Sequence, residues 1–289
     1  MSATAAVFFS ESVLSLYPIL IKKVPTNLNT QTLSRFLVYP LAALIVSGLG
    51  PLKAAYSHGF AKNLGLGAIN VAHIGASYMA FKELPAGIAM SLFYTYPLWN
   101  LFGASFFFGE AFPWHLFPVV IVALIGAALV AFSRTPEEKE NNKPLNLKGI
   151  AAALIAALTE TAIFLAVKAA GSSSSPFTSV HQIYLGGLPI LLAYLAYNSN
   201  EKEEQIDTSP KHWLPLILFN GFLGFTGYCL RFWSIPRLST ILYSILSMFG
   251  VLAAFTWGHF LANEPLQGQG LAGAGLLTAA IGYLRYVTH

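Results

Sequence analysis

The stretch VVIVALIGAALVAF, from Val119 to Phe132, carries no charge and no alternation of polar and apolar residues. Lipid offers backbone groups no hydrogen-bond partners, so such a run crosses a membrane as a helix, whereas a barrel strand would alternate. About 20 apolar residues are needed to cross roughly 30 Å of hydrocarbon. Ten such runs are found, near residues 3–21, 30–49, 63–81, 86–108, 114–133, 149–170, 177–197, 213–231, 237–261 and 267–287. We therefore predict an all-α polytopic membrane protein with ten transmembrane helices.

The composition of the whole chain points to the same class. Of its 289 residues, 55% are hydrophobic and only 10% are charged, with a mean hydropathy of +0.61, whereas soluble domains carry about 25% charged residues. Such sparse charge leaves no basic surface for nucleic acid. The single cysteine, Cys229, excludes a disulfide within the chain. No Cys/His spacing suggests a metal site, and no cofactor is expected.

The two halves of the chain repeat each other. FSES around Glu11 matches LTET around Glu160. The matched pairs are Glu11/Glu160, Pro40/Pro189 and Lys62/Lys211 at a separation of 149 residues, Pro85/Pro236 at 151 and Glu110/Glu264 at 154. Five helices is an odd number, so the halves take opposite orientations, as in inverted-repeat transporters with a site near the bilayer midplane. We expect a first repeat at 1–135, a linker at 136–148 and a second repeat at 149–289.

Three sets of motifs carry a family resemblance. The second predicted helix contains LSRFLVYPLAAL with Arg35 and Phe36, and the fourth and ninth end in FFFGEAFPW and FLANEPLQ. The fifth and tenth are rich in glycine. In this order, and in both halves, the motifs resemble the EamA-like ten-helix members of the drug/metabolite transporter superfamily. Two departures are that Asn263 stands in place of the second glycine and Tyr184 at the position matching Arg35.

The resemblance implies a central cavity lined by helices 1–4 and 6–9, with helices 5 and 10 packed outside as supports. It also implies small solutes as substrates, such as amino acids, drugs or other metabolites. It places both termini in the cytoplasm, whereas the distribution of Lys and Arg along the chain favours both termini outside.

Glu11 and Glu160 are the sharpest candidate site residues. A charge at the centre of a membrane helix costs about 2.5–3.5 kcal/mol on insertion scales, so it indicates a function. The pair could bind protons or a cationic group; alternatively, both are protonated and join helices through hydrogen bonds. Both are proton-coupling candidates. The complete set of substrate-binding candidates is Glu11, Asn70, His73, Tyr78, Tyr94, Trp99, Glu160, Asn220, Arg231 and Tyr243.

Other charged residues have simpler interpretations. Lys168 and Arg231 fall near predicted helix ends, where they could bind an anionic substrate; snorkelling to the membrane interface is the favoured interpretation. Glu110 and Glu264 directly precede predicted helices, where a carboxylate suits the positive N-terminus. Asn70 and His73 belong to a polar stripe that either lines a hydrated cavity or joins helices.

These observations predict a secondary transporter of small metabolites, amino acids or related compounds, working by alternating access, with export as one direction compatible with them. Two carboxylates without a central Lys/Arg cluster argue against sugar phosphates or nucleotide sugars. An exchanger of that type remains an alternative, as does a channel or lipid scramblase on the same fold.

We do not expect an enzyme, because no HxxxH-type spacing and no GxSxG occur and no catalytic residue is nominated. The expected partners are a small-molecule solute and membrane lipid, with no nucleic acid. A monomer and a dimer are both compatible with the sequence. The first residues, Met1 to Leu20, lack a basic n-region and have Glu11 in their middle, so we read them as a retained transmembrane helix. Without a targeting extension, we expect a plasma membrane or a bacterial inner membrane.

Overall fold

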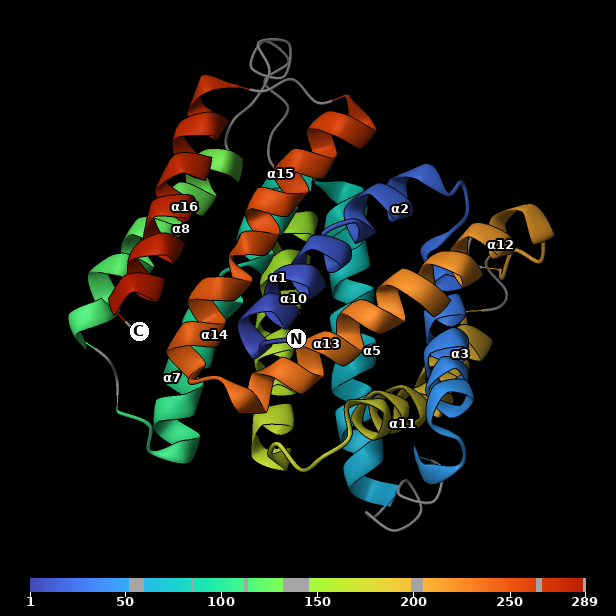
Figure 1. Ribbon diagram of the computed structural model, residues 1–289. Coiled ribbons are helices and arrows are strands. Elements are labelled where there is room, and N and C mark those ends of the chain that lie inside the picture. Colours follow the sequence, from blue (N-terminus) through green and yellow to red (C-terminus); the bar gives the residue numbers. More distant parts are fainter. Residues whose placement is uncertain are drawn as a thin grey trace.

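The computed structural model describes residues 1–51, 60–84, 86–111, 114–131, 146–198, 205–263 and 267–287, and these ranges contain helices and turns but no strand (Figure 1). The first half has α1 (Ala3–Leu14), α2 (Tyr17–Lys23), α3 (Leu28–Ser47), α5 (Phe60–Glu83), α6 (Ala86–Phe93), α7 (Tyr96–Phe108), η1 (Trp114–Leu116) and α8 (Phe117–Ala131). The second has α10 (Leu147–Ala170), α11 (Pro176–Tyr197), α12 (Pro210–Leu218), the π-helix η3 (Phe219–Gly224), α13 (Phe225–Ser234), η4 (Ile235–Arg237), α14 (Thr240–Ser247), α15 (Phe249–Ala262) and α16 (Gly268–Val287). Pro85, Glu264 and nearly all of the predicted linker lie outside the described residues.

Six helical stretches within the described ranges are long and apolar enough to cross a membrane. They are Ala3–Lys23, Lys62–Glu83, Leu147–Ala170, Pro176–Tyr197, Pro210–Arg237 and Thr240–Ala262. A shorter apolar helix, Trp114–Val130, coincides with the predicted fifth span. The remaining predicted spans are also helical, as α3, α6 with α7, and α16. The all-helical membrane class is therefore confirmed, while the count of ten spans and the inverted repeat stay predictions.

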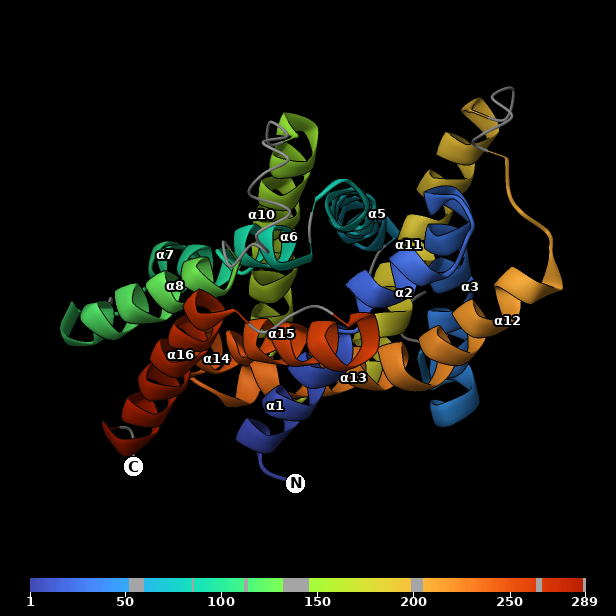
Figure 2. The same ribbon diagram turned by 90° about the horizontal axis from the view of Figure 1, so that it is seen from above.

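The helices α8 and α16 form a pair at one side of the molecule (Figures 1 and 2). Two glycines allow their backbones to touch. A Cβ on Gly126 would lie 2.8 Å from the carbonyl oxygen of Gly273, and a Cβ on Gly273 would lie 2.5 Å from that of Gly126. Small residues at such crossings are typical of helix packing in lipid, where no hydrophobic force holds helices together. This pair occupies the outer position that the family resemblance implies for helices 5 and 10.

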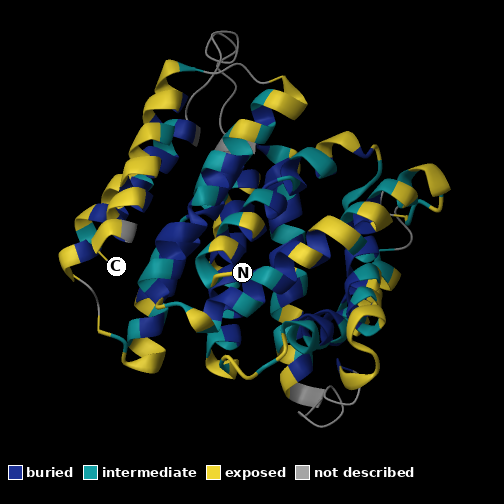
Figure 3. Ribbon diagram, in the orientation of Figure 1, coloured by how far each residue is buried: buried dark blue, intermediate teal, exposed yellow. Residues whose placement is uncertain are grey.

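The remaining helices surround a buried centre. α5 packs against α10 and α11, α11 also packs against α3, and α1 packs against α13. Figure 3 shows buried residues in the middle of the bundle and exposed ones along its outward faces. Large apolar side chains such as Ile45, Phe106 and Phe222 are among the exposed ones, which suits a surface solvated by lipid. The polar side chains buried inside are therefore the features that need a functional or structural reason.

Three apolar stretches are interrupted near their middle. α1 gives way to α2 at Ser15 and Leu16, α6 to α7 at Tyr94 and Thr95, and α14 to α15 at Met248. Interrupted helices free backbone groups and are typical of the sites of secondary transporters. All three interruptions lie close in sequence to buried polar side chains, so a candidate site is expected at the centre of the bundle.

Candidate substrate-binding site

Arg231 on α13 joins two buried carboxylates from different helices. Its Nη1 donates to Glu160 Oε1 on α10 over 2.6 Å, and its Nη2 contacts Glu11 Oε1 and Oε2 on α1 over 2.9 and 2.8 Å. The side chains of Arg231, Glu160 and Glu11 are 3%, 2% and 0% exposed. We call these three residues the central triad. Burying charges this deeply costs several kcal/mol, which pairing and hydrogen bonds offset.

The central triad corrects the snorkelling interpretation of Arg231. The helical stretch that contains it continues to Arg237, so Arg231 lies more than one turn inside its span. Its guanidinium points to the two glutamates and not to an interface. Lys168, for which snorkelling was also the favoured interpretation, pairs instead with another side chain, because its Nζ lies 3.0 Å from Glu110 Oε1.

The two carboxylates of the triad are held differently. Glu11 Oε2 accepts a further hydrogen bond from the Tyr94 hydroxyl over 2.8 Å, so both of its oxygens are well occupied. Glu160 Oε2 accepts no hydrogen bond from the described residues, although His73 Nε2 lies 3.3 Å away. The other ring nitrogen of His73 lies 3.2 Å from the Ala156 carbonyl oxygen, which fixes the ring orientation. Glu160 is therefore the carboxylate with capacity for a proton or a cationic group.

A second arginine, Arg35 on α3, lies in the same core and is 3% exposed. Its guanidinium carbon faces five tyrosine rings: Tyr17 at 4.4 Å, Tyr228 at 4.5 Å, Tyr39 at 5.1 Å, Tyr184 at 5.7 Å and Tyr78 at 5.9 Å from the ring centroids. We call Arg35 with these rings the tyrosine cage. Cation–π contacts of this kind contribute about 0.5–2 kcal/mol each. They replace part of the hydration that the guanidinium loses on burial.

The hydrogen bonds of Arg35 leave part of its guanidinium unused. Nε donates to the Tyr184 hydroxyl over 2.7 Å, and Nη1 reaches the Tyr78 hydroxyl only at 3.5 Å. Nη2 has no acceptor among the described residues. None of the ion pairs between described residues involves Arg35. The tyrosine cage thus holds a positive charge without a carboxylate, in contrast to the central triad.

Tyr228 and Asn220 connect the cage to its surroundings. The Tyr228 ring lies 4.5 Å from the guanidinium carbon of Arg35 and 5.7 Å from that of Arg231, so it stands between the two arginines. Asn220, in the π-helical stretch η3, accepts from the Tyr17 hydroxyl over 2.7 Å and donates to Ser34 Oγ over 3.1 Å. The buried polar residues therefore form two adjoining clusters.

The predicted site residues fall into three groups. Those in or beside the central triad are Glu11, His73, Tyr94, Glu160 and Arg231. Tyr78 and Asn220 belong to the tyrosine cage or contact it. Tyr243 and Asn70 are buried, and neither the Tyr243 hydroxyl nor the Asn70 amide has a hydrogen-bond partner among the described residues. Trp99 lies apart from both clusters, 43% exposed on α7 with its ring against Phe102.

Sequence reasoning missed the tyrosine cage. Among the cage residues only Tyr78 is a predicted site residue; Arg35, Tyr17, Tyr39, Tyr184 and Tyr228 are not. The prediction that the chain lacks a central Lys/Arg cluster has to be corrected, because two arginines, Arg35 and Arg231, are both in the core and both lie near the ring of Tyr228. A usable signal was present: an arginine within a membrane-spanning run is by itself a functional-site hypothesis.

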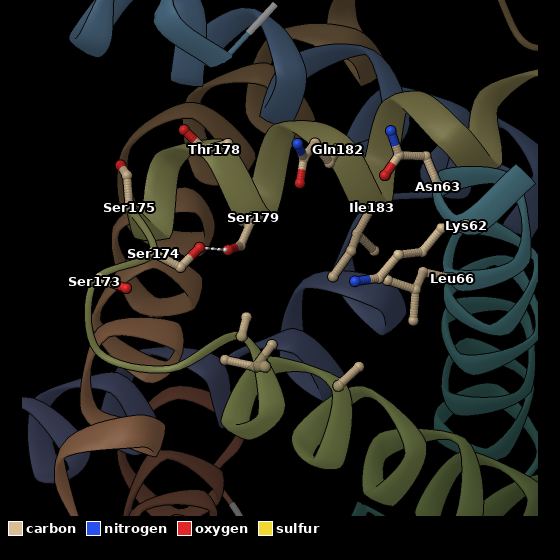
Figure 4. A pocket seen from close by; sticks show the side chains of 13 residues that line it. Lys62, Asn63, Leu66, Ser173, Ser174, Ser175, Thr178, Ser179, Gln182 and Ile183 are labelled. Carbon is tan, nitrogen blue, oxygen red and sulfur yellow. Dashed lines mark hydrogen bonds between the residues drawn. The ribbon is translucent and has the colours of Figure 1, made fainter. Parts of the chain in front are cut away.

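Two hollows flank the clusters at opposite ends of α5. The Lys62 hollow, of about 490 Å³, is lined by the beginnings of α5 and α11 and the end of α10. Figure 4 shows Lys62 on one side of it and, on the other, Ser174 and Ser179, whose hydroxyls are 3.2 Å apart. The Lys82 hollow, of about 640 Å³, is lined by the ends of α2 and α5 and the beginning of α3. Lys62 and Lys82 are roughly 30 Å apart along the helix.

Outside the core, Glu110 binds the end of another helix. Burial acts to raise the pKa of Glu110, but the neighbouring Thr240 and the Lys168 ammonium group outweigh it and lower the pKa. Lys168 also donates to the Leu238 carbonyl over 3.3 Å. Glu110 therefore joins the ends of α7 and α10, in addition to its place before a helix. Within the described ranges, no group of three or more His, Cys, Asp or Glu side chains could hold a metal ion.

Comparison with known proteins agrees with this architecture. Residues 147–286 match the model of the EamA-like transporter family. No curated protein matches the chain. Among 28 matching chains of solved structures is one titled only as the crystal structure of a protein. It has a TM-score of 0.74 and 16% identity, and the alignment covers 99% of this chain and 97% of that one. That likeness concerns the fold alone.

The apolar helices make this chain an integral membrane protein of the polytopic helical class. Its residues 147–286 are those of the EamA-like transporter family, in the drug/metabolite transporter superfamily, which confirms the resemblance seen in the sequence.

Proposed function

We propose that the protein is a secondary transporter that carries small metabolites, amino acids or related compounds, across the membrane by alternating access. The observation that carries this proposal is the position of Arg231, which bonds to Glu11 of the predicted first repeat and to Glu160 of the second. A single guanidinium thereby couples the two halves of the chain at a buried site.

The charge of the central triad suits a coupling role. With both glutamates ionised, the triad carries one excess negative charge in a medium that penalises it. A proton or a substrate ammonium group at Glu160 Oε2 would balance that charge, since this oxygen accepts no hydrogen bond from the described residues, although His73 Nε2 lies 3.3 Å away. Loading the site would also weaken the hold of Glu160 on Arg231. If the two access states of the carrier differ in the contact between Glu160 and Arg231, loading the site shifts the equilibrium between them.

The interrupted helices support the proposed repeat. Tyr94 and Met248, where α6–α7 and α14–α15 are interrupted, are 154 residues apart, which is also the separation of Glu110 and Glu264. Equivalent interruptions in two inverted halves are a feature of secondary transporters, whose substrates bind beside them. Tyr94 directly contacts Glu11.

The two hollows suit access from alternate sides. Leu66 lines the Lys62 hollow; Asn70 and His73 follow it by four and seven residues, so all three share one face of α5. This face leads to Glu160. At the other end of α5, Lys82 lines the second hollow and Tyr78 of the cage follows one turn inward. Both approaches stop at buried side chains, as an occluded carrier requires.

Counterflow in proteoliposomes tests the proposal. Vesicles preloaded with a mixed pool of unlabelled amino acids should take up labelled amino acids saturably and transiently above equilibrium. Glu160→Gln should reduce this exchange by about tenfold or more, because it removes a charged hydrogen bond of about 1.5–3 kcal/mol. Glu110→Gln makes the same chemical change outside the core and should keep wild-type exchange. Absent counterflow from well-folded protein, or exchange unaffected by Glu160→Gln, would contradict the proposal.

A second candidate, exchange of sugar phosphates, is favoured by Arg35, a buried arginine without a carboxylate partner among the described residues, which weakens the sequence argument against it. The same vesicles loaded with inorganic phosphate and supplied with a labelled sugar phosphate test this alternative. Flux that rises linearly with solute concentration and shows no counterflow would instead indicate a channel.

A further inference from the structure

The tyrosine cage contains a buried positive charge that the protein does not neutralise. Arg35 makes no ion pair with a described residue, and its Nη2 has no acceptor there. A buried guanidinium without a counter-charge is costly, and tyrosine rings compensate only in part. The group that best completes a guanidinium is a carboxylate, which can accept two parallel hydrogen bonds.

The Lys82 hollow lies one helical turn from this arginine on three separate helices. On each helix, a residue that lines the hollow stands four positions from a member of the cage. The pairs are Ile21 with Tyr17, Gln31 with Arg35, and Lys82 with Tyr78. Residues four apart are neighbours on one helix face, with an axial offset of about 6 Å. The hollow and the cage are therefore successive layers of the same helices.

Gln31 separates the hollow from the cage. It is 2% exposed, and the two hydrogens of its Nε2 are shared among three carbonyl oxygens, of Ile21, Val24 and Thr26, at 3.2, 3.3 and 3.4 Å. These are long hydrogen bonds, and its Oε1 has no partner among the described residues. A side chain held in this way can turn aside without losing a strong contact, which would join the hollow to Arg35.

The charges around the hollow favour an anion. Lys22 and Lys82 line it, and Asp207 is the acidic residue among its lining residues. The Asp207 carboxylate is engaged by the His212 ring and by the Ser209 backbone N–H. Basic side chains at the mouth of a cleft raise the local concentration of anions.

The charge count inside distinguishes a monoanion from a dianion. Arg231 is already bound by two carboxylates, so only the single charge of Arg35 is available to a ligand. A phosphate ester with two negative charges would leave one of them buried and unpaired. A carboxylate on a small organic molecule leaves none, and the surrounding rings suit an apolar or aromatic body.

We infer that Arg35 and the tyrosine cage form a binding site for the carboxylate of a small organic monoanion or zwitterion, reached from the Lys82 hollow. This inference rests on the proposed transport function and specifies its substrate class. For an amino acid, the carboxylate meets Arg35 while the ammonium group faces the side of Glu160, with Tyr228 between the two arginines.

Direct binding to the purified full-length protein tests the site. The probes are benzoate, its uncharged analogue benzamide, and inorganic phosphate, each titrated by calorimetry. Benzoate should bind, and benzamide and phosphate should bind at least about tenfold more weakly. Arg35→Lys keeps the charge but removes the fork of donors and should weaken benzoate binding by about tenfold. Arg237→Lys is the matched control in the peripheral η4 and should bind benzoate as the wild type does.

A second variant protects the test if Arg35→Lys fails to fold. Lys82 is exposed, so Lys82→Gln should fold normally, while slowing benzoate association at low salt and not at high salt. Equal affinity for benzoate and benzamide, tighter binding of phosphate, or no effect of either variant would overturn the inference. Counterflow without benzoate binding overturns this inference alone, whereas benzoate binding without counterflow overturns the proposed transport function.

Discussion

The hydroxyl oxygen of Tyr94 occupies the place that a side chain at position 250 would need: a Cβ on Gly250 would lie 1.6 Å from it. Gly250 is buried at the start of α15, and Tyr94 sits where α6 gives way to α7. The same hydroxyl donates to Glu11 over 2.8 Å. A missing side chain on one interrupted helix therefore positions a donor from the other interrupted helix against the central triad.

Gly250→Ala should consequently displace Tyr94 from Glu11. The loss of a hydrogen bond to a charged group predicts a destabilisation of about 1.5–3 kcal/mol, in addition to the steric strain. Tyr94→Phe removes the hydroxyl without adding an atom and should cost less than Gly250→Ala. The melting temperatures of the detergent-purified proteins measure both effects.

Gly282→Ala is the control for that comparison, because a Cβ on Gly282 meets no atom within 4 Å. It should melt at the wild-type temperature. If Gly250→Ala melted there as well, the close approach of Tyr94 to Gly250 would not be required for stability.

The glycines between α8 and α16 predict a different effect. Gly126→Leu places a Cβ 2.8 Å from the carbonyl oxygen of Gly273, so the two helix backbones have to move apart. We expect a destabilisation of about 1–3 kcal/mol, as for other overpacked sites. The binding of solute should be unchanged in the folded fraction, because this pair lies outside the buried clusters. Gly275→Leu on α16, where a Cβ meets nothing within 4 Å, is the matched control; comparable losses in both variants would contradict the expected role of the contact.

The sequence predicted the helical class well because that class depends on a property of every residue. Long apolar runs in lipid have no alternative to the helix, so the predicted ranges agree with the observed helices to within a few residues. Glu11 and Glu160 were found for a related reason, since a carboxylate in such a run stands out. The interruptions at Tyr94 and Met248 were not predicted, because they depend on contacts between helices.

Arg231 shows where sequence reasoning fails. Its position near the end of a predicted span allowed two opposite side-chain directions, toward the interface or toward the core. Only the packing of α13 against α1, which brings the Arg231 side chain to Glu11 and Glu160, decides between them. The tyrosine cage was not predicted for the same reason. Its rings of Tyr17, Tyr39 and Tyr184 come from three helices and meet only after folding.

Asp207, in the turn before α12, predicts a pH dependence of stability. The backbone N–H of Ser209 and then the ring of His212 bind its carboxylate and lower the pKa of Asp207. A carboxyl with a lower pKa in the folded state stabilises that state above its unfolded pKa of about 3.9, and the stabilisation is lost as the pH falls through the folded-state pKa.

Comparison of the wild type with Asp207→Asn between pH 3 and pH 7, values chosen to span about 3.9, checks this dependence. At neutral pH the wild type should melt at a higher temperature than Asp207→Asn. This difference in melting temperature should shrink as the pH is lowered. A difference that grew on acidification would have the opposite sign and would contradict the assigned carboxylate contacts.

The central triad allows the two interpretations of Glu11 and Glu160 to be separated. Arg231→Met removes the partner of both carboxylates; breaking a buried ion pair from one side costs about 3–5 kcal/mol. We expect this variant to be recovered poorly or as aggregate by size-exclusion chromatography. Adding Glu11→Gln and Glu160→Gln removes the stranded charges and should restore a monodisperse, folded protein.

The neutral triple variant then becomes the decisive sample for counterflow. If the glutamates only join helices, a folded triple variant should still exchange solute, because glutamine side chains can also form hydrogen bonds between helices. If they bind a proton or a cationic group, the triple variant should be folded and inactive, since no charge remains for loading to change. If Arg231→Met folded as well as the wild type, the two carboxylates would not need Arg231 as a partner. That result would contradict the coupling role proposed for Arg231.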